Sequence, residues 1–258
     1  MDPRRHRGPA RLWPSISDRD ETTMVTANHD RPFRLAVFDF DGTLADSFPW
    51  FVTELREVAA QWRFRSVSLD EDPWLRQLDA HAVLRRLGVP RWKVPLIATD
   101  LRQRMTRDIE HIRLFDGVAP MLDRLDGQGL GLAIASSNAA VNVERVLGAR
   151  LCRTIPVREC GASISGKALR LRRLLRRCGM PPERAIYIGD EIRDIAAARK
   201  VGIAAGVVSW GYNDIRALRR ERPDWVFHQV DEIADLLAGD GGPRRIVPAS
   251  QQALCCID

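Results

Sequence analysis

The chain has 258 residues, of which 45% are hydrophobic and 29% are charged, and its formal net charge is +6. This length and composition suit a globular protein with a full hydrophobic core, built as one large domain or two smaller ones. No apolar run approaches the roughly 18 residues that a membrane helix needs, so no membrane partner is expected. The positive charge is modest for a nucleic-acid-binding protein and equally suits one that handles anionic small molecules.

The two ends of the chain differ in composition from the rest. Residues 1–32 are rich in arginine, carry acidic residues as well and lack the apolar core of a signal peptide, so we expect a disordered extension. Residues 239–258 are rich in glycine and proline and are expected to form a flexible tail. The cysteines form no C-x-x-C pair, and their odd number argues against a disulfide framework. A reducing cytoplasm is therefore the expected compartment.

Short apolar runs along the chain predict β-strands. They lie at residues 33–40, 130–136, 184–190, 202–210 and 224–230. Continuous apolar runs are typical of strands that are buried on both faces, as in a parallel sheet. The segments between the runs show helical patterns. Strands that alternate with helices predict an α/β fold with a Rossmann-like, doubly wound parallel sheet.

The clearest helical pattern in this region covers residues 168–179. Its apolar residues recur at helical spacing, at Leu171, Leu174, Leu175 and Cys178. We predict that its arginines point away from this stripe; they are Arg170, Arg172, Arg173, Arg176 and Arg177. No aromatic residues are interleaved among them to stack bases. The basic face is therefore interpreted as a solvated surface and not as a nucleic-acid site.

Residues 48–115 interrupt the alternation of strands and helices. They contain helical patterns at 50–62, 78–88 and 94–112 but no convincing buried strand. Four tryptophans fall in this segment, at Trp50, Trp62, Trp74 and Trp92, and are expected to belong to its core. We predict a small helical cap domain with a core of its own, inserted into an α/β domain formed by residues 33–47 and 116–238.

Polar residues directly follow three of the predicted strands. They are Asp39, Asp41, Gly42 and Thr43 after the first, Ser136, Ser137 and Asn138 after the second, and Asp190, Glu191 and Asp194 after the third. Ligands of an open parallel sheet bind outside the carboxyl ends of its strands. We therefore expect these side chains to share one edge of the sheet.

This set of residues predicts the chemistry of the site. Asp39, Asp41 and Asp190 concentrate negative charge, and hard carboxylate oxygens of this kind suit Mg²⁺ together with a substrate phosphate. Lys167, at the start of the helix that carries the arginines, supplies a positive charge, and Ser136 can donate a hydrogen bond to a phosphoryl oxygen. A lysine at a helix N-terminus is unfavourable unless an anion is present, which supports a functional role.

Four segments of the chain resemble the motifs of the haloacid dehalogenase-like superfamily of phosphohydrolases. They are "DFDGTLADS", "AIASSN", "SGKALRL" and "GDEIRD", in order and at ordinary spacing, and the resemblance runs from about residue 33 to about residue 230. The chain is most similar to the phosphoglycolate-phosphatase-like branch, whose helical cap is inserted directly after the first motif. Residues 48–115 lie at that position.

The resemblance implies a role for each matching residue. Asp39 would be the nucleophile that forms an aspartyl-phosphate, and Asp41 would be the general acid and then the base. Ser136 would bind the phosphoryl group, and Lys167 would neutralise charge on it and on Asp39. The implied Mg²⁺ ligands are the Asp39 carboxylate, the Asp41 main-chain carbonyl and Asp190, with Asp194 as the second acid of the fourth motif. Other polar residues at this edge are expected to bind substrate: Gly42, Thr43, Ser137 and Asn138.

Several assignments stay open from the sequence. Ser137 would replace Ser136 as the phosphoryl donor if the strand register shifts by one residue. Glu191 could compete with Asp190 as a metal ligand. Asp194 could contact the metal directly, act through water, bind Lys167 or form a purely structural salt bridge.

The sequence thus predicts a Mg²⁺-dependent phosphatase that hydrolyses a small phosphorylated metabolite, as a monomer or a homodimer. A phosphomutase would share every core residue, but the stretch after Ser47 lacks a histidine for the second sugar hydroxyl. A dehalogenase needs no acid at Asp41. A non-catalytic protein that binds nucleic acid is the alternative from another class, and the intact acidic set argues against it.

Overall fold

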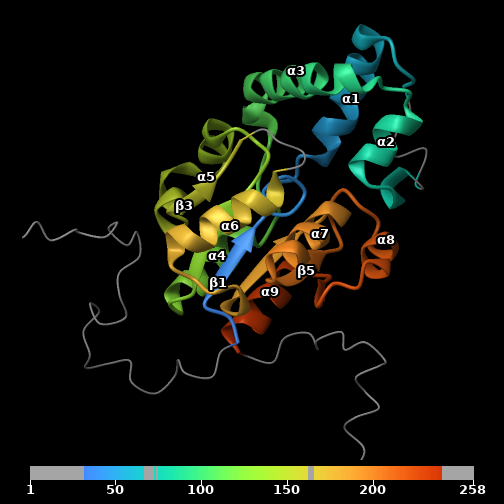
Figure 1. Cartoon of the computed structure of the whole chain (residues 1–258). Helices are drawn as coiled ribbons and strands as arrows, with labels where there is room; N and C mark the ends of the chain where they lie inside the picture. The colour runs from blue at the N-terminus through green and yellow to red at the C-terminus, as the bar shows by residue number, and fades with distance from the viewer. Residues whose placement is uncertain (1–31, 67–72, 74, 162–165, 240–258) are drawn as a thin grey trace, which may run out of the picture.

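The computed structural model of the protein describes residues 32–66, 73, 75–161 and 166–239. Within this part, six parallel strands form one sheet in the order β3-β2-β1-β4-β5-β6 (Figure 1). The strands are β1 (Leu35–Phe38), β2 (Gly131–Ala135), β3 (Val157–Glu159), β4 (Ala185–Gly189), β5 (Ala204–Val208) and β6 (Trp225–Phe227). The predicted parallel α/β sheet is confirmed. The predicted terminal extension and tail lie outside the described residues, except for residues 32 and 239.

The apolar runs predicted five of these strands, each with one to three extra residues at its ends. The central strands β1, β2 and β4 are buried along their whole length, which explains their continuous apolar sequences. The strand β3 was not predicted. It has only three residues, two of them charged, and it lies at the edge of the sheet, so it carries no apolar run.

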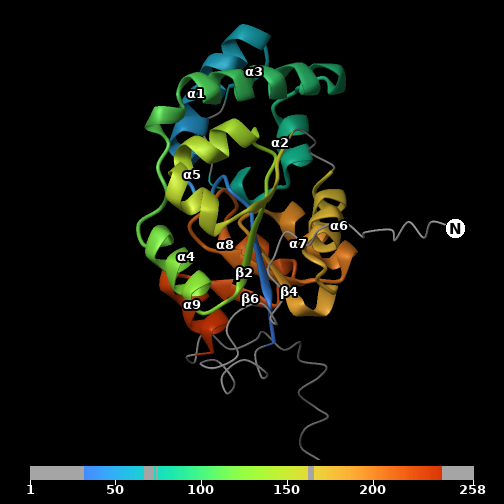
Figure 2. The same ribbon diagram turned by 90° about the vertical axis from the view of Figure 1, so that its left-hand side faces the viewer.

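Helices cover both faces of the sheet, as a doubly wound fold requires. On one face lie α4 (Val118–Gly127), α5 (Ala140–Thr154) and α9 (Val230–Ala238), and on the other lie α6 (Lys167–Cys178), α7 (Ile192–Val201) and α8 (Ile215–Arg220). Figure 2 shows the first group on the left of the sheet and α6 on the right. Because side chains alternate along a strand, Phe38 packs in the first core and Val37 in the second.

Helix α6 confirms the predicted apolar stripe but corrects one of the arginines. Leu171, Leu174 and Leu175 are buried against the sheet. Arg170 was expected to point into solvent with the others, and this prediction is wrong, because the residue is only 7% exposed. It lies three residues after Lys167 and so shares the helix face that enters the edge of the sheet. Burial lowers the pKa of its guanidinium.

The segment between β1 and β2 is helical. It contains α1 (Phe48–Trp62), α2 (Ala80–Arg86) and α3 (Val94–Arg107), with short 3-10 turns at Leu75–Gln77, Arg91–Lys93 and Ile109–His111. In Figures 1 and 2 these helices lie above the carboxyl end of β1. Apolar residues of all three helices, among them Val58, Val83 and Ile97, pack in a cluster separate from the two cores of the sheet. The division into a cap and an α/β domain stays a prediction.

The tryptophans of this segment differ in their exposure and in their contacts. The indoles of Trp50 and Trp62 donate hydrogen bonds to the carboxylates of Asp108 and Asp100, at 3.2 and 2.8 Å. Trp92 was expected in the core and is instead 68% exposed, so that expectation is wrong. It lies in a 3-10 turn at the outer surface. Trp74 lies outside the described residues.

The chain enters and leaves the helical segment side by side. The Asp46 N–H donates to the Arg113 carbonyl at 2.8 Å, and the Phe115 N–H donates to the Leu44 carbonyl at 2.9 Å. The two crossings therefore form a short antiparallel pair at the edge of the sheet. No helix of the described part combines the length and the apolar character that crossing a membrane requires.

Candidate active site

The central strands bring two predicted acids to the same edge of the sheet. β1 pairs in parallel with both β2 and β4, and Phe38 stands in register with Ile134 and Ile188. Asp39 follows β1 directly, and its N–H donates to the Ile188 carbonyl at 2.8 Å. Asp190 directly follows Gly189, the last residue of β4. The expectation that residues far apart in the sequence share this edge is confirmed.

A buried ion-pair cluster lies at the end of β1. The Lys167 ammonium donates to Asp39 Oδ2 at 2.5 Å and also to Asp194 Oδ1. The side chains of Lys167 and Asp39 are each only 4% exposed. Tyr187, inside the sheet, donates its hydroxyl to Asp194 Oδ1 at 3.1 Å. The ammonium is therefore fixed beside the predicted nucleophile by a second carboxylate.

Asp194 is held in this position by the first turn of α7. Its Oδ2 accepts the N–H groups of Asp190 and Glu191 at 3.2 and 2.9 Å. Glu191 in turn caps the helix through the Asp194 N–H, which makes a reciprocal capping box. Of the roles left open for Asp194, contact with Lys167 is the one seen in this structure.

Asp190 is enclosed on all sides and fully buried. Its Oδ1 accepts from the Thr43 hydroxyl and its Oδ2 from the Tyr212 N–H, both at 2.8 Å. A Cβ at Gly42 or Gly211 would collide with the Asp190 side chain. Gly42 also has φ 75°, a left-handed conformation that glycine adopts without strain. The glycine of the first motif thus allows the backbone to approach the acid of the fourth.

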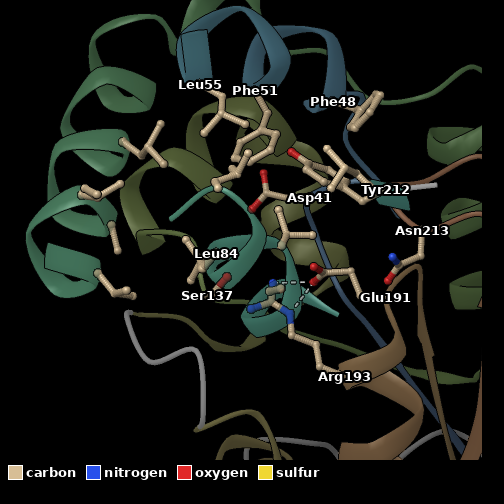
Figure 3. A pocket seen from close by; sticks show the side chains of 18 of the residues that line it. Asp41, Phe48, Phe51, Leu55, Leu84, Ser137, Glu191, Arg193, Tyr212 and Asn213 are labelled. Atoms are coloured by element: carbon tan, nitrogen blue, oxygen red, sulfur yellow. Dashed lines mark hydrogen bonds and ion pairs between the residues drawn. The ribbon is translucent and has the colours of Figure 1, made fainter. Parts of the chain in front are cut away.

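Asp41 lines a cavity together with side chains of the helical segment. Asn138 Nδ2 donates to both of its carboxylate oxygens at 3.1 Å. Figure 3 shows the Asp41 carboxylate among the other side chains that line this cavity. Loss of hydration, followed by the charge of Asp39, raises the pKa of Asp41 to about 7. This carboxyl group can therefore hold a proton near neutral pH.

The two serines after β2 have different surroundings. Ser136 is fully buried, and its Oγ accepts the Asn138 N–H at 3.0 Å. Ser137 lines the cavity beside Asp41. Gly42 and Thr43 are buried against Asp190 and do not belong to the described cavity lining. Substrate contact by these residues stays a prediction.

The electrostatics of the edge are dominated by acids. Among the residues described there, the carboxyl groups of Asp39, Asp41, Asp190, Glu191 and Asp194 outnumber the cations Lys167, Arg170 and Arg193. Burial raises the pKa of Asp190 well above its ordinary value, and Glu191, Asp194 and Asp39 add to the effect. Burial would lower the pKa of Lys167, but the carboxylates of Asp194 and Asp39 outweigh it, and its pKa is raised. The buried negative charge is only partly neutralised by the protein itself.

This excess of buried carboxylates fits a divalent cation. One carboxylate oxygen from each of Asp39, Glu191 and Asp194 lies within 4.8 Å of the others. This set does not include the predicted ligand Asp190, whose main-chain N–H donates to Asp194. Hard oxygen donors are the ligands that Mg²⁺ prefers. Glu191, which the sequence left open as an alternative metal ligand to Asp190, forms an ion pair with Arg193 here. The residues present therefore suit the predicted metal, although the ligand set stays a prediction.

Sequence reasoning missed the loop that follows β5. Gly211, Tyr212 and Asn213 contact Asp190 or the start of α7, and the Asn213 side chain accepts the Ile192 N–H at 3.0 Å. The same loop binds Arg76 of the helical segment. The rule that ligands gather at strand ends would have found it, since "GYND" (residues 211–214) directly follows the predicted strand at 202–210.

The fold and this arrangement of acids, lysine and serine define a class of hydrolases. Residues 36–208 match the family described as haloacid dehalogenase-like hydrolases, and the chain belongs to this family. The resemblance drawn from the four motifs is thereby confirmed.

Two relatives and one solved structure illustrate what the chain is similar to. A phosphoglycolate phosphatase from Synechococcus elongatus is 33% identical over 76% of this chain and 93% of its own. The tyrosine-protein kinase PtkA from Mycobacterium tuberculosis is 28% identical over 79% of this chain and 72% of its own. The crystal structure of CbbY from Rhodobacter sphaeroides in complex with phosphate has a TM-score of 0.62 at 22% identity, and covers 80% of this chain and 99% of that one.

Proposed function

We propose that the protein is a Mg²⁺-dependent phosphatase that hydrolyses a small phosphate monoester through an aspartyl-phosphate on Asp39. The observation that carries the proposal is the buried contact of Lys167 with Asp39 at 2.5 Å. A carboxylate with no hydrogen on its attacking oxygen needs no base, and the ammonium beside it offsets the charge of an approaching phosphate.

In the first step, an Asp39 oxygen forms a bond to phosphorus as the bond from phosphorus to the leaving oxygen breaks. Asp41, whose pKa is raised to about 7, gives its proton to that oxygen. In the second step, water attacks the aspartyl-phosphate and Asp41 takes its proton. Phosphate leaves and the Asp39 carboxylate is restored. Lys167 and the Ser136 hydroxyl are the proposed partners of the phosphoryl oxygens.

The metal would be held by the Asp39 carboxylate, the Asp41 carbonyl and Asp190, with Glu191 and Asp194 close by. When bound, Mg²⁺ would supply charge neutralisation for the phosphoryl group. Asp194 positions Lys167, since it accepts a hydrogen bond from the ammonium and from Tyr187. Thr43 and Gly42 position Asp190.

The relatives named phosphoglycolate phosphatases support 2-phosphoglycolate as a first substrate to assay. The relatives named tyrosine-protein kinases share the family core, so incubation with ATP and a tyrosine peptide belongs in the same screen. Cytoplasmic location and a monomeric or homodimeric state stay predictions.

The test compares the wild type with Asp39→Asn, with Mg²⁺ and with EDTA, on a panel of phosphorylated metabolites. We expect turnover by the wild type with Mg²⁺ and a loss of at least about a thousandfold from the substitution. The matched control is Asp116→Asn, which changes an exposed aspartate two residues before α4. This variant should keep full turnover. Turnover that survives Asp39→Asn or EDTA would refute the mechanism. Release of phosphate distinguishes hydrolysis from transfer to a second sugar hydroxyl, as in a phosphomutase.

A further inference from the structure

A cavity of about 290 Å³ lies next to Asp41, between the edge of the sheet and the helices α1, α2 and α3. Figure 3 shows the Asp41 carboxylate pointing into it, with Phe51 and Leu55 of α1 on one side and Leu84 of α2 on another. Asp41 is the proposed proton donor to the leaving oxygen. The group bonded to that oxygen must therefore occupy this cavity during the reaction.

The walls of the cavity are mainly apolar. Aliphatic and aromatic side chains from all three helices line it, among them Phe48, Leu55, Leu84, Leu101 and Met105. Many of them also belong to the apolar cluster of the helical segment, so the cavity extends into the interior of that segment. An apolar group in this space would be removed from water without losing hydrogen bonds.

The cations that line the cavity already have partners. Arg76 donates to the carbonyls of Tyr212 and Gly211 at 3.0 and 2.5 Å, and its guanidinium lies 4.8 Å from the ring centre of Phe48. Arg193 is paired with Glu191. These are two of the three cationic side chains in the described lining.

The third cation, Arg102, lies on α3 and donates to Thr99 Oγ1 of the same helix at 2.8 Å. The hydroxyl of Thr99 is a neutral acceptor, so this contact does not neutralise Arg102. The apolar walls, which make up most of the described lining, therefore carry the argument. A leaving group as short as glycolate would contact little of this apolar surface, whereas a longer hydrocarbon would bury more of it. The lining therefore favours an apolar leaving group of several carbons.

We propose that the preferred substrates are phosphate monoesters with an apolar leaving group of several carbons, and not those of short carboxylated alcohols such as glycolate. This inference rests on the proposed phosphatase function. The phosphate lies at the acidic edge with Lys167, the leaving oxygen lies at Asp41, and the hydrocarbon extends between α1, α2 and α3.

The test uses ethyl, butyl and hexyl phosphate, whose leaving alcohols have similar intrinsic reactivity, together with 2-phosphoglycolate. The matching alkylphosphonates, which contain no cleavable P–O–C bond, measure binding by calorimetry with Mg²⁺ present. Each buried methylene contributes at most about a fourfold gain. We expect kcat/KM and phosphonate affinity to rise by at least about tenfold from ethyl to hexyl, and 2-phosphoglycolate to rank below butyl phosphate.

Two pairs of variants test whether the dependence on chain length arises in this cavity. Leu84→Asn puts an amide in the cavity wall and should reduce the hexyl-to-ethyl ratio by about tenfold, while Leu96→Asn on the exposed side of α3 should keep it. Ala98→Phe fills the cavity and should also lower the ratio, whereas Ala60→Phe, on the exposed side of α1, should not.

The outcomes separate this inference from the proposed function. Phosphonate affinity that rises with chain length supports the inference even if no ester is hydrolysed, and absent hydrolysis then refutes the phosphatase proposal alone. Hydrolysis with no dependence on chain length, or with 2-phosphoglycolate preferred, overturns the inference and leaves the phosphatase proposal standing. If a variant does not fold, the wild-type series decides the matter.

Discussion

Two serines follow β2, and their side chains have different surroundings. Ser136 is buried at the strand end and accepts the Asn138 N–H. In our proposal its hydroxyl donates to a phosphoryl oxygen. Ser137 lines the cavity that receives the leaving group in our proposal. The position of Ser136, directly after the strand, is equivalent to that of Asp39 after β1.

We therefore predict that Ser136→Ala lowers kcat by about 10- to 100-fold, since a hydrogen bond to a charged group contributes about 1.5–3 kcal/mol. Ser137→Ala should change kcat less than threefold. Steady-state kinetics on the substrate found in the screen measures both. A larger loss for Ser137→Ala would identify Ser137 as the phosphoryl donor, the alternative that the sequence left open.

Gly42 combines a left-handed backbone with close contact to Asp190 and Tyr212. Gly42→Ala is expected to lower the free energy of unfolding by about 2–4 kcal/mol, because the added methyl group adds a steric clash to the backbone strain. Gly88 is the matched control: its φ is 71°, but no atom lies within 4 Å of a Cβ built there. Gly88→Ala should cost only about 1–2 kcal/mol. Urea unfolding of both variants compares them, and equal losses would contradict the contact.

At the scale of elements, the loop after β5 connects the helical segment to the acidic edge. Asn213 donates to the carbonyls of Arg76 and Leu78 at 2.8 and 2.9 Å and accepts from the first turn of α7. The guanidinium of Arg76 binds two carbonyls of the same loop. The segment after α1 is thus held against the loop that contacts Asp190.

Arg76→Lys should weaken this attachment, because an ammonium cannot reproduce the two-pronged contact of a guanidinium. Loss of one net hydrogen bond of about 1 kcal/mol increases local opening by roughly five- to tenfold. Hydrogen exchange followed by mass spectrometry should detect faster exchange in peptides that cover residues 75–88 and 211–214. Arg102→Lys, whose contact stays within α3, is the control. Unchanged exchange in Arg76→Lys would show that this contact does not hold the segment.

At the scale of the whole molecule, the ends of β1 and β4 concentrate buried carboxylates that the protein neutralises only in part. A bound divalent cation should therefore stabilise the folded state. We predict that Mg²⁺ raises the free energy of unfolding, by about 2.7 kcal/mol at a hundredfold excess over its Kd. Thermal unfolding with MgCl₂ and with NaCl of equal ionic strength measures the effect. Asp190→Asn should reduce it, and an equal gain in NaCl would argue against a specific site.

Much of the fold could be predicted because its central strands are buried on both faces and therefore have continuous apolar sequences. The strand β3 could not, since an edge strand of three residues has no such pattern. Arg170 was misassigned because helical spacing alone does not say that the first turn of α6 enters the edge of the sheet. Trp92 was misassigned because an aromatic residue signals burial only on average.

The sequence by itself determined the parallel sheet, the inserted helices, the family and the acids at the strand ends, because these depend on local patterns and on a rule of topology. Only the tertiary structure decided that Thr43 and Tyr212 bind Asp190, that Asp194 binds Lys167 and that a largely apolar cavity adjoins Asp41. These contacts join residues separated by up to 147 positions. Their geometry depends on how the sheet edge, the helical segment and the loop after β5 pack together, which no local pattern encodes.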